Sequence, residues 1–273
     1  MDDLSLIASG GAGINVLSSG DLPAGARALA IGTDQAHLLR ARKESGLTTY
    51  LTTPDEVQGW EHVESSVASH FVSVLPPAIK QAFTRKVVLH CAGLGGATGT
   101  GIATALNRLR GGLSKPTIHL ALLPFSVERQ RHARALEAAE RMDSESALVV
   151  FPNDLIARSS PDRSFQQSMR IANALVMEVA RGLAGLAEGS IESIARSKGR
   201  LTPVLGSGPE FSPASLAEFG AAGAVSGHLI APAGSTWLAD IGPKMKDNGI
   251  TTVGHESISI SGSHWLALLR RTS

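Results

Sequence analysis

The stretch Ala92-Gly93-Leu94-Gly95-Gly96-Ala97-Thr98-Gly99-Thr100-Gly101 decides the fold of this chain. It follows an apolar, β-branched run over 86–91 that predicts a buried strand, and it precedes a helical pattern that Gly111 and Gly112 are expected to end. Glycine permits positive φ angles and close approach of a ligand to the backbone. The helix directs its free N–H groups and its positive dipole end at the loop. The stretch therefore predicts a phosphate-binding loop, and a tight turn with close helix packing is the weaker alternative.

The overall composition narrows the class of protein. The chain has 273 residues, a net charge of +1 and a single cysteine. A near-neutral charge gives no reason to expect nucleic acid as a partner. One cysteine cannot form an internal disulfide, and the acidic start Met1-Asp2-Asp3 does not resemble a signal peptide. No apolar run reaches the ~18 residues that span a bilayer. We therefore expect a cytoplasmic protein that is not inserted directly into a membrane.

A second glycine-rich stretch, residues 9–15, follows a short apolar strand over 4–8. It has Gly11 and Gly13 in the spacing of a dinucleotide fingerprint, but the third glycine and the later acidic residue are absent. This argues against an oxidoreductase of the Rossmann type. We interpret the stretch as a second phosphate-facing loop, with a helix starting near Val16.

Strands and helices alternate through the first 151 residues. Further strands are predicted at 27–31, 48–53, 116–123 and 147–151, with helices between them, one of which covers 54–75. This alternation indicates an α/β fold with a doubly wound, mostly parallel sheet. Polar residues that end the strands, such as Asp34, then share the carboxyl edge where ligands bind. Asp34 itself fits either a helix cap or a ligand contact.

The pattern of the later part of the chain divides the whole chain into three units. A long helical pattern runs from about Ser164 to Ser197, with a break near Gly189. Short strands and helices follow, including a helix over 213–219 and another that Asn248 and Gly249 end. We predict a nucleotide-binding domain over 1–163, a central helix and catalytic-loop region over 164–199, and a small α+β domain over 200–273.

The central stretch resembles the glycine-rich loop of the tubulin/FtsZ family, which binds guanine-nucleotide phosphates. Other segments resemble FtsZ in the same order along the chain, from about residue 7 to residue 208. These segments are 7–15, 32–36, 124–128, 149–154 and 171–173. The resemblance implies the tubulin/FtsZ-like GTPase fold with a reduced C-terminal domain, and GTP or GDP as the ligand, with Mg²⁺ as a candidate companion ion.

The same resemblance implies a set of nucleotide-binding residues. Glu128 stands where the family contacts the ribose, and Asn173 stands where it reads the base. Met169 occupies the position of a stacking aromatic residue, and His132 that of an arginine, for which Arg131 is a neighbouring substitute. The remaining residues carried over from the family are Gly10, Gly11, Ala12, Gly13, Asn15, Thr33, Asp34, Gly93, Gly95, Gly96, Ala97, Thr98, Gly99, Thr100, Gly101 and Asn153.

Two departures from the family bear on hydrolysis. The region 52–57 has no glycine where FtsZ contacts the terminal phosphate. The acidic loop that completes the neighbouring subunit's site is also changed. Glu192 takes the second acidic position, and Glu188 is the candidate for the first, which falls on Gly189. These glutamates are either catalytic or simply solvated residues at a helix end, and GTPase activity therefore stays open.

Two functions follow as expectations from the resemblance. The first is a GTP-binding cytoskeletal protein that self-associates head-to-tail into filaments, with hydrolysis completed by the neighbouring subunit. The second is a nucleotide-binding regulator that does not hydrolyse or polymerise and that partners another FtsZ- or tubulin-like filament.

Overall fold

The computed structural model describes most of the chain. The described residues are 4–23, 26–52, 68–69, 77–82, 87–113, 116–158, 164–207, 211, 216, 221–260 and 264–271. The helices predicted over 54–75 and 213–219 lie almost entirely outside these residues.

Ten strands form one continuous sheet in the described part of the chain, in the order β3-β2-β1-β4-β5-β6-β7-β10-β8-β9. The strands are β1 (Leu4–Ser9), β2 (Arg27–Gly32), β3 (Thr48–Leu51), β4 (Val87–Gly93), β5 (Thr117–Leu123), β6 (Ala147–Pro152), β7 (Gly199–Ser207), β8 (Ala224–Pro232), β9 (Thr251–Ser257) and β10 (His264–Arg271). All neighbours from β3 to β7 are parallel, and β10 pairs antiparallel with both β7 and β8.

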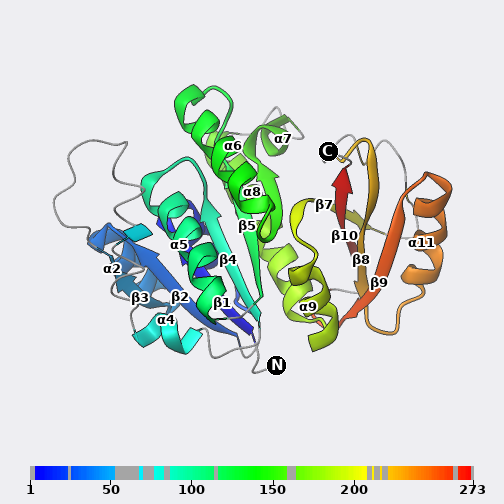
Figure 1. The fold of residues 1–273 in the computed structure, drawn as a ribbon, viewed down its shortest axis with the longest axis horizontal. Coiled ribbons are helices and arrows are strands. Elements are labelled where there is room, and N and C mark those ends of the chain that lie inside the picture. The colour runs from blue at the N-terminus through cyan, green and yellow to red at the C-terminus, as the bar shows by residue number, and fades with distance from the viewer. Residues whose placement is uncertain are drawn as a thin grey trace.

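Helices cover both faces of the parallel strands (Figure 1). They are α1 (Gly10–Ser18), α2 (Gln35–Ser45), α4 (Pro77–Ala82), α5 (Ala97–Leu113), α6 (Arg129–Asp143), α7 (Asn153–Arg158), α8 (Phe165–Ala184), α9 (Glu188–Arg196) and α11 (Trp237–Asp247). None of the helices in the described part is both long and apolar enough to cross a bilayer.

Strand alternation explains the two layers of helices. In β1, Leu6 packs into the cluster shared with α1, α8 and α9, while its neighbour Ile7 packs against α4 and α5 on the other face. Both residues are almost fully buried. A strand buried on both faces needs apolar residues throughout, as the runs in β1, β4, β5 and β6 show. The predicted doubly wound α/β fold is therefore confirmed.

Strand β7 joins the two halves of the molecule. Its first residues pair with β6, and its later residues pair with β10. Strands β10 and β8 then pack with α11 around Trp265, which is 1% exposed. Figure 1 shows this smaller α+β unit beside the larger one, with α9 between them. The boundaries at 163 and 199 stay a prediction.

Several predicted element boundaries were wrong at glycines. The first helix begins at Gly10, before the expected Val16, and α5 begins at Ala97, so half of the central stretch is helical. Helix α5 also continues past Gly111 and Gly112 to Leu113. Glycine lowers helix propensity by only about 1 kcal/mol, which tertiary packing can override.

The long helical pattern also breaks earlier than predicted. Helix α8 ends at Ala184, and α9 begins at Glu188, so the break lies at 185–187 and not at Gly189. A side chain at Gly185 would lie 2.4 Å from Ser257 Oγ, and Ile258 donates its N–H to the Gly185 carbonyl at 3.1 Å. Contact with the end of β9 therefore sets the position of the break.

A buried histidine pair lies inside the smaller unit. His228 Nδ1 and His255 Nε2 are 3.0 Å apart on the neighbouring strands β8 and β9. Burial, together with the nearby His255 and Arg270, lowers the pKa of His228 to about 4. Burial also lowers the pKa of His255. Both side chains are therefore neutral at pH 7.

We expect the free energy of unfolding to fall as pH decreases from about 6.5 towards 4. Unfolded His228 binds a proton near pH 6.5, whereas the folded side chain binds one only near pH 4. The contribution of the buried neutral ring to the free energy of unfolding is therefore fully present above pH 6.5 and is lost as the pH falls from 6.5 towards 4. Urea unfolding of wild type and His228→Leu at pH 7.5, 6 and 5 measures this. The variant should lose less stability on acidification, and equal losses would contradict the assignment.

Candidate functional site

The two glycine-rich stretches meet at the carboxyl edge of the parallel strands. A Cβ added to Gly10 would lie 2.9 Å from the amide nitrogen of Gly99, although these residues are far apart in the chain. One added to Gly13 would lie 2.3 Å from the Cys91 carbonyl oxygen. Helices α1 and α5 therefore start side by side, with their N-termini at one place.

The predicted binding glycines fall into two groups. Gly10, Gly13, Gly95 and Gly99 are buried, and any side chain on them would strike neighbouring backbone. Because these residues have no side chain, α1 and α5 can approach β4 closely, and α6 can approach the central loop. The more accessible positions of the two stretches are Gly11, Ala12, Gly93, Gly96, Ala97 and Thr98. Backbone groups at these positions are the ones that a ligand can reach, whereas Thr100 and Gly101 are buried.

The starts of α1 and α5 retain unpaired backbone donors. Ser9 occupies the N-cap position of α1 but makes no side-chain cap hydrogen bond. Gly96, which precedes α5, has no side chain with which to cap it. Neither helix has an acidic residue in its first turn. The arrangement presents N–H groups and two positive dipole ends with no acidic side chain in either first turn, which suits an anion.

Threonine hydroxyls form hydrogen bonds at this carboxyl edge of the sheet. Thr98 Oγ1 lies 2.9 Å from Thr33 Oγ1, which links α5 to the end of β2. The buried Thr100 accepts a hydrogen bond from the Gly95 N–H at 2.8 Å. Thr98 and Thr33 thus remain at the surface, while Thr100 holds the loop together from inside.

Asp34 caps a helix in this structure. Its Oδ1 accepts the backbone N–H of His37 at 3.1 Å at the start of α2. His37 Nε2 in turn lies 2.9 Å from Asn15 Oδ1. Burial and Arg40 lower the pKa of His37, while Asp34 opposes the shift. His37, which the sequence did not single out, therefore connects the two predicted binding residues Asn15 and Asp34.

The turn before α6 brings its charged residues to the same edge. A Cβ on Gly95 would lie 2.1 Å from the Arg131 carbonyl oxygen, so the start of α6 touches the central loop. Glu128 pairs with the exposed Arg131 guanidinium at 2.7 Å. His132 uses Nδ1 to donate to the Pro124 carbonyl at 2.8 Å. Of the two alternatives from the sequence, Arg131 projects its charge to the surface, and His132 is tied to its own turn.

The end of β6 contributes an unsatisfied polar atom. Asn153 is 9% exposed, and among the described residues no hydrogen-bond partner reaches its buried Oδ1. Its neighbour Asp154 accepts the N–H of Ser126 at 2.9 Å and so fixes the turn before α6. A buried polar atom without a partner is costly, and a bound ligand could satisfy it. Met169 and Asn173 are half-buried on α8.

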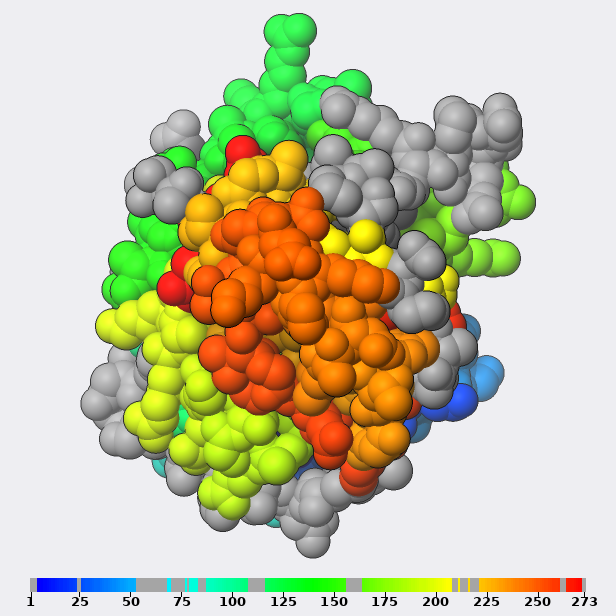
Figure 2. Space-filling model, turned by 90° about the vertical axis from the view of Figure 1, so that its right-hand side faces the viewer, coloured from blue at the N-terminus to red at the C-terminus, as the bar shows by residue number. Residues whose placement is uncertain are grey.

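The two candidate catalytic glutamates do not join this cluster. Glu188 starts α9, and Glu192 lies one turn later, where it pairs with Arg196 at 3.6 Å. Figure 1 shows α9 near the end of the molecule where β1 begins, far from α6 and α7 at the opposite end. Figure 2 shows residues of α9 at the surface beside α11 and β9. Within one chain, these glutamates cannot act on a ligand at the glycine-rich edge.

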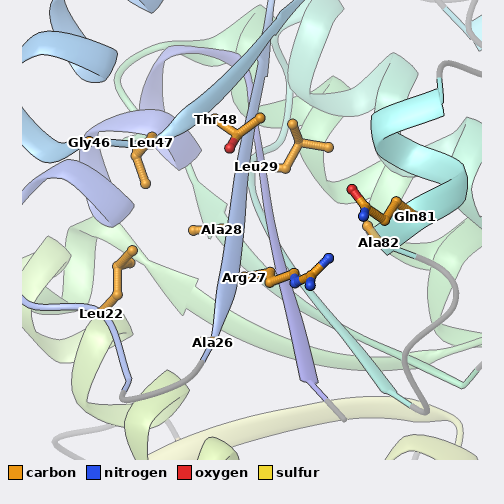
Figure 3. Close-up of a pocket in the computed structure, with 10 residues that line it drawn as sticks. All are labelled: Leu22, Ala26, Arg27, Ala28, Leu29, Gly46, Leu47, Thr48, Gln81 and Ala82. Carbon is orange, nitrogen blue, oxygen red and sulfur yellow. The ribbon is translucent and has the colours of Figure 1, made fainter. Parts of the chain in front are cut away.

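A cavity of about 420 Å³ lies elsewhere, at the start of β2 and β3 (Figure 3). Its lining includes Leu22, Arg27, Leu29, Leu47 and Gln81. These residues lie at the opposite edge of the sheet from the glycine-rich stretches. The cavity is therefore separate from the candidate site.

A chain of buried polar side chains behind the loop was missed in the sequence. It joins Ser9, His90, His119, Asn107 and Ser146, all of which are less than 9% exposed. The signal available in the sequence was one histidine in each of two apolar strands, His90 and His119. Their contact could not be predicted, because it depends on β4 and β5 pairing with each other.

Relatives with a similar sequence match about two thirds of this chain. FtsZ 1 of Methanocaldococcus jannaschii is 26% identical over 189 residues, 67% of this chain and 51% of that protein. FtsZ 1 of Thermococcus kodakarensis is 26% identical over 187 residues, 66% of this chain and 49% of that protein. The chain therefore spans about half the length of the curated relatives it matches. No family model matches it.

Solved structures of similar fold cover nearly the whole chain. The protofilament of CetZ2 from Haloferax volcanii with bound GTPγS has a TM-score of 0.76 at 20% identity, covering 99% of this chain and 93% of that one. The empty FtsZ dimer of M. jannaschii has a TM-score of 0.72 at 19% identity, covering 99% and 88%. These similarities show that this chain has the fold of those FtsZ and CetZ2 structures.

Proposed function

The chain is a divergent member of the tubulin/FtsZ superfamily, and from this premise we propose that it binds a guanine nucleotide and assembles head-to-tail into filaments. The observation that carries the proposal is the meeting of two uncapped helix N-termini, α1 and α5, at the carboxyl edge of the sheet. This geometry suits the phosphates of a nucleotide.

The residues present fit a nucleoside diphosphate or triphosphate. Backbone groups near Gly11 and Gly96 would hold the phosphates, with the Thr33 and Thr98 hydroxyls beside them. The unpartnered Oδ1 of Asn153 can accept a hydrogen bond from the ligand. Glu128 would bind the ribose, and Asn173 and Met169 on α8 would contact the base. Mg²⁺ would accompany the phosphates.

Exposed apolar side chains at both ends support self-association. Val127 is 84% exposed and Phe165 is 66% exposed, and Phe165 lies against Phe125 in the turn that carries Glu128. At the other end, Ile258 is 64% exposed and bonds to the Gly185 carbonyl beside α9. Contact between two different ends is heterologous and builds an open polymer. In such a stack, Glu188 and Glu192 would lie at the nucleotide of the next subunit.

A second candidate is a nucleotide-binding regulator of another filament. The pairing of Glu192 with Arg196 at 3.6 Å favours it, because a carboxylate held by a cation on its own helix is less free to orient an attacking water. In that case the protein would bind nucleotide without hydrolysing it or forming polymer.

We expect purified protein to carry or bind guanine nucleotide in preference to adenine nucleotide. Chromatography of the ligand released by denaturation identifies the base, and titration with fluorescent GDP, with GTP and ATP as competitors, gives affinities. Sedimentation with GTP or GDP then tests assembly. Absence of any nucleotide binding would overturn the proposal, and binding without sedimentable polymer would favour the regulator.

A further inference from the structure

Five buried side chains form a continuous hydrogen-bonded network that runs from the central loop across the face of the sheet that α5 covers. Ser9 Oγ lies 3.4 Å from the Gly99 carbonyl oxygen and 2.8 Å from His90 Nε2. His90 Nδ1 lies 2.9 Å from Nδ1 of His119 on the next strand. The hydrogen-bonded network continues on the far side of the His119 ring.

The far end of this hydrogen-bonded network lies on α5 and just before β6. His119 Nε2 is 2.8 Å from Asn107 Oδ1, and Ser146 Oγ is 2.6 Å from the same oxygen. All five side chains are buried, with Asn107 the most exposed at 8%. Burial and the neighbouring His119 hold the pKa of His90 well below its usual range. His90 is therefore neutral, with one ring proton.

The chemistry of the contacts allows two complete arrangements of the protons. In the first, the Ser9 hydroxyl donates to His90 Nε2, His90 Nδ1–H donates to His119, and His119 Nε2–H donates to the Asn107 oxygen. The Ser146 hydroxyl also donates to that oxygen, as the observed orientation of the amide permits. The Ser9 hydroxyl and both ring N–H groups then point away from the loop, and Gly99 receives nothing from Ser9.

In the second arrangement the ring N–H groups and the Ser9 hydroxyl point towards the loop. The Asn107 amide turns over, so that its two N–H groups donate to His119 Nε2 and Ser146. His119 Nδ1–H donates to His90, His90 Nε2–H donates to Ser9, and the Ser9 hydroxyl donates to the Gly99 carbonyl. Each ring carries one proton in both arrangements. Interchange therefore requires a transient local opening to solvent, in which each ring loses a proton to water at one nitrogen and regains one from water at the other, with no net uptake.

We propose that this chain, which we call the Ser9–Ser146 relay, is a two-state device that positions the Gly99 peptide and couples phosphate binding to the interior of the sheet. The proposal rests on the proposed nucleotide site. A phosphate at the starts of α1 and α5 favours the arrangement whose N–H dipoles point towards it. By linkage, that arrangement raises the affinity for the phosphate.

The relay also explains why α1 lacks a side-chain cap. Ser9 is the N-cap residue, but its hydroxyl faces His90 and Gly99 instead of the first amides of α1. Those amides stay open to the ligand. Ser9, His90, His119 and Asn107 thus act as positioning residues behind the site.

Nitrogen NMR of ¹⁵N-histidine-labelled wild type, without and with saturating GDP, tests the relay directly. Protonated and unprotonated ring nitrogens have well-separated resonances, and His90→Gln and His119→Gln variants assign them. We expect GDP to shift the proton of His90 towards Nε2 and that of His119 towards Nδ1. A purely structural role for the rings would leave both tautomers unchanged.

Variants test the effect on affinity. Ser9→Ala and His90→Leu should each weaken GDP binding about fivefold or more, the effect of one lost hydrogen bond. The matched control is His228→Leu, which removes a ring from the other buried histidine pair and should leave affinity unchanged. Thermal melts establish that each variant is folded at the temperature of titration.

The outcomes separate the relay from the nucleotide site. If wild type binds no GDP, the proposed function fails and the relay fails with it. If wild type binds GDP while the tautomers stay the same, or if His228→Leu weakens binding as much as His90→Leu, the relay alone is overturned.

Discussion

Replacement of Gly95 by alanine is expected to destabilise the protein by about 2–5 kcal/mol, the sum of left-handed strain and overpacking. Gly95 has a φ of 81°, which an L side chain rarely adopts, and its Cβ would lie 2.1 Å from the Arg131 carbonyl oxygen. The clash can be relieved only by moving α6 away from the central loop, whereas the left-handed strain at residue 95 remains. Such a shift also disturbs the Gly95–Thr100 hydrogen bond that closes the loop.

The same substitution should weaken nucleotide binding by about tenfold or more, equivalent to about 1.4 kcal/mol. Urea unfolding measures the stability, and titration with fluorescent GDP measures the affinity. The control is Gly242→Ala in α11, where a Cβ meets no heavy atom within 4 Å and φ is not positive. That change should keep or slightly raise stability. Wild-type affinity in folded Gly95→Ala would show that the loop is not the binding site.

Substitution of the α9 glutamates should have the second large effect. If a neighbouring subunit completes the site, Glu188→Gln or Glu192→Gln should lower GTP turnover about 100-fold, a typical effect of losing an acid–base group. Nucleotide affinity of the isolated subunit should be unchanged, because α9 lies far from the glycine-rich edge (Figure 1). The control is Glu140→Gln on the exposed face of α6.

Two further measurements test the role of the glutamates: GTP turnover at different protein concentrations, and GTP turnover in a mixture of two variants. Turnover per subunit should rise with protein concentration, because a completed site needs two subunits. A folded Gly95→Ala subunit keeps its glutamates, so mixing it with Glu192→Gln should restore part of the turnover. Unchanged turnover in both glutamine variants, or turnover independent of concentration, would remove the glutamates from catalysis and favour the regulator.

Much of the fold followed from local patterns. The apolar runs around Leu6 and Leu89 fill the strands as predicted, because a strand covered on both faces must be apolar throughout. The ends of helices were less predictable where glycine was present. Gly10 and Gly111 lie within helices, and the loss of helix propensity at a glycine is only about 1 kcal/mol.

Parts of the candidate site depended on contacts that no local pattern contains. Asn15 and Asp34 were separate predictions, and only the fold shows that His37 connects them. The histidines of the relay were unremarked in the sequence, because His90 and His119 meet only when β4 and β5 pair.

The sequence by itself determined the alternation of strands and helices and the clustering of glycines at strand ends, since both depend on neighbouring residues. The tertiary structure decided why those glycines are needed. Gly13 faces Cys91 and Gly95 faces Arg131, each from a distant part of the chain. It also decided that Glu188 lies at the opposite end from the glycine-rich edge. Such relations follow from strand order and helix packing, which local residue preferences leave open.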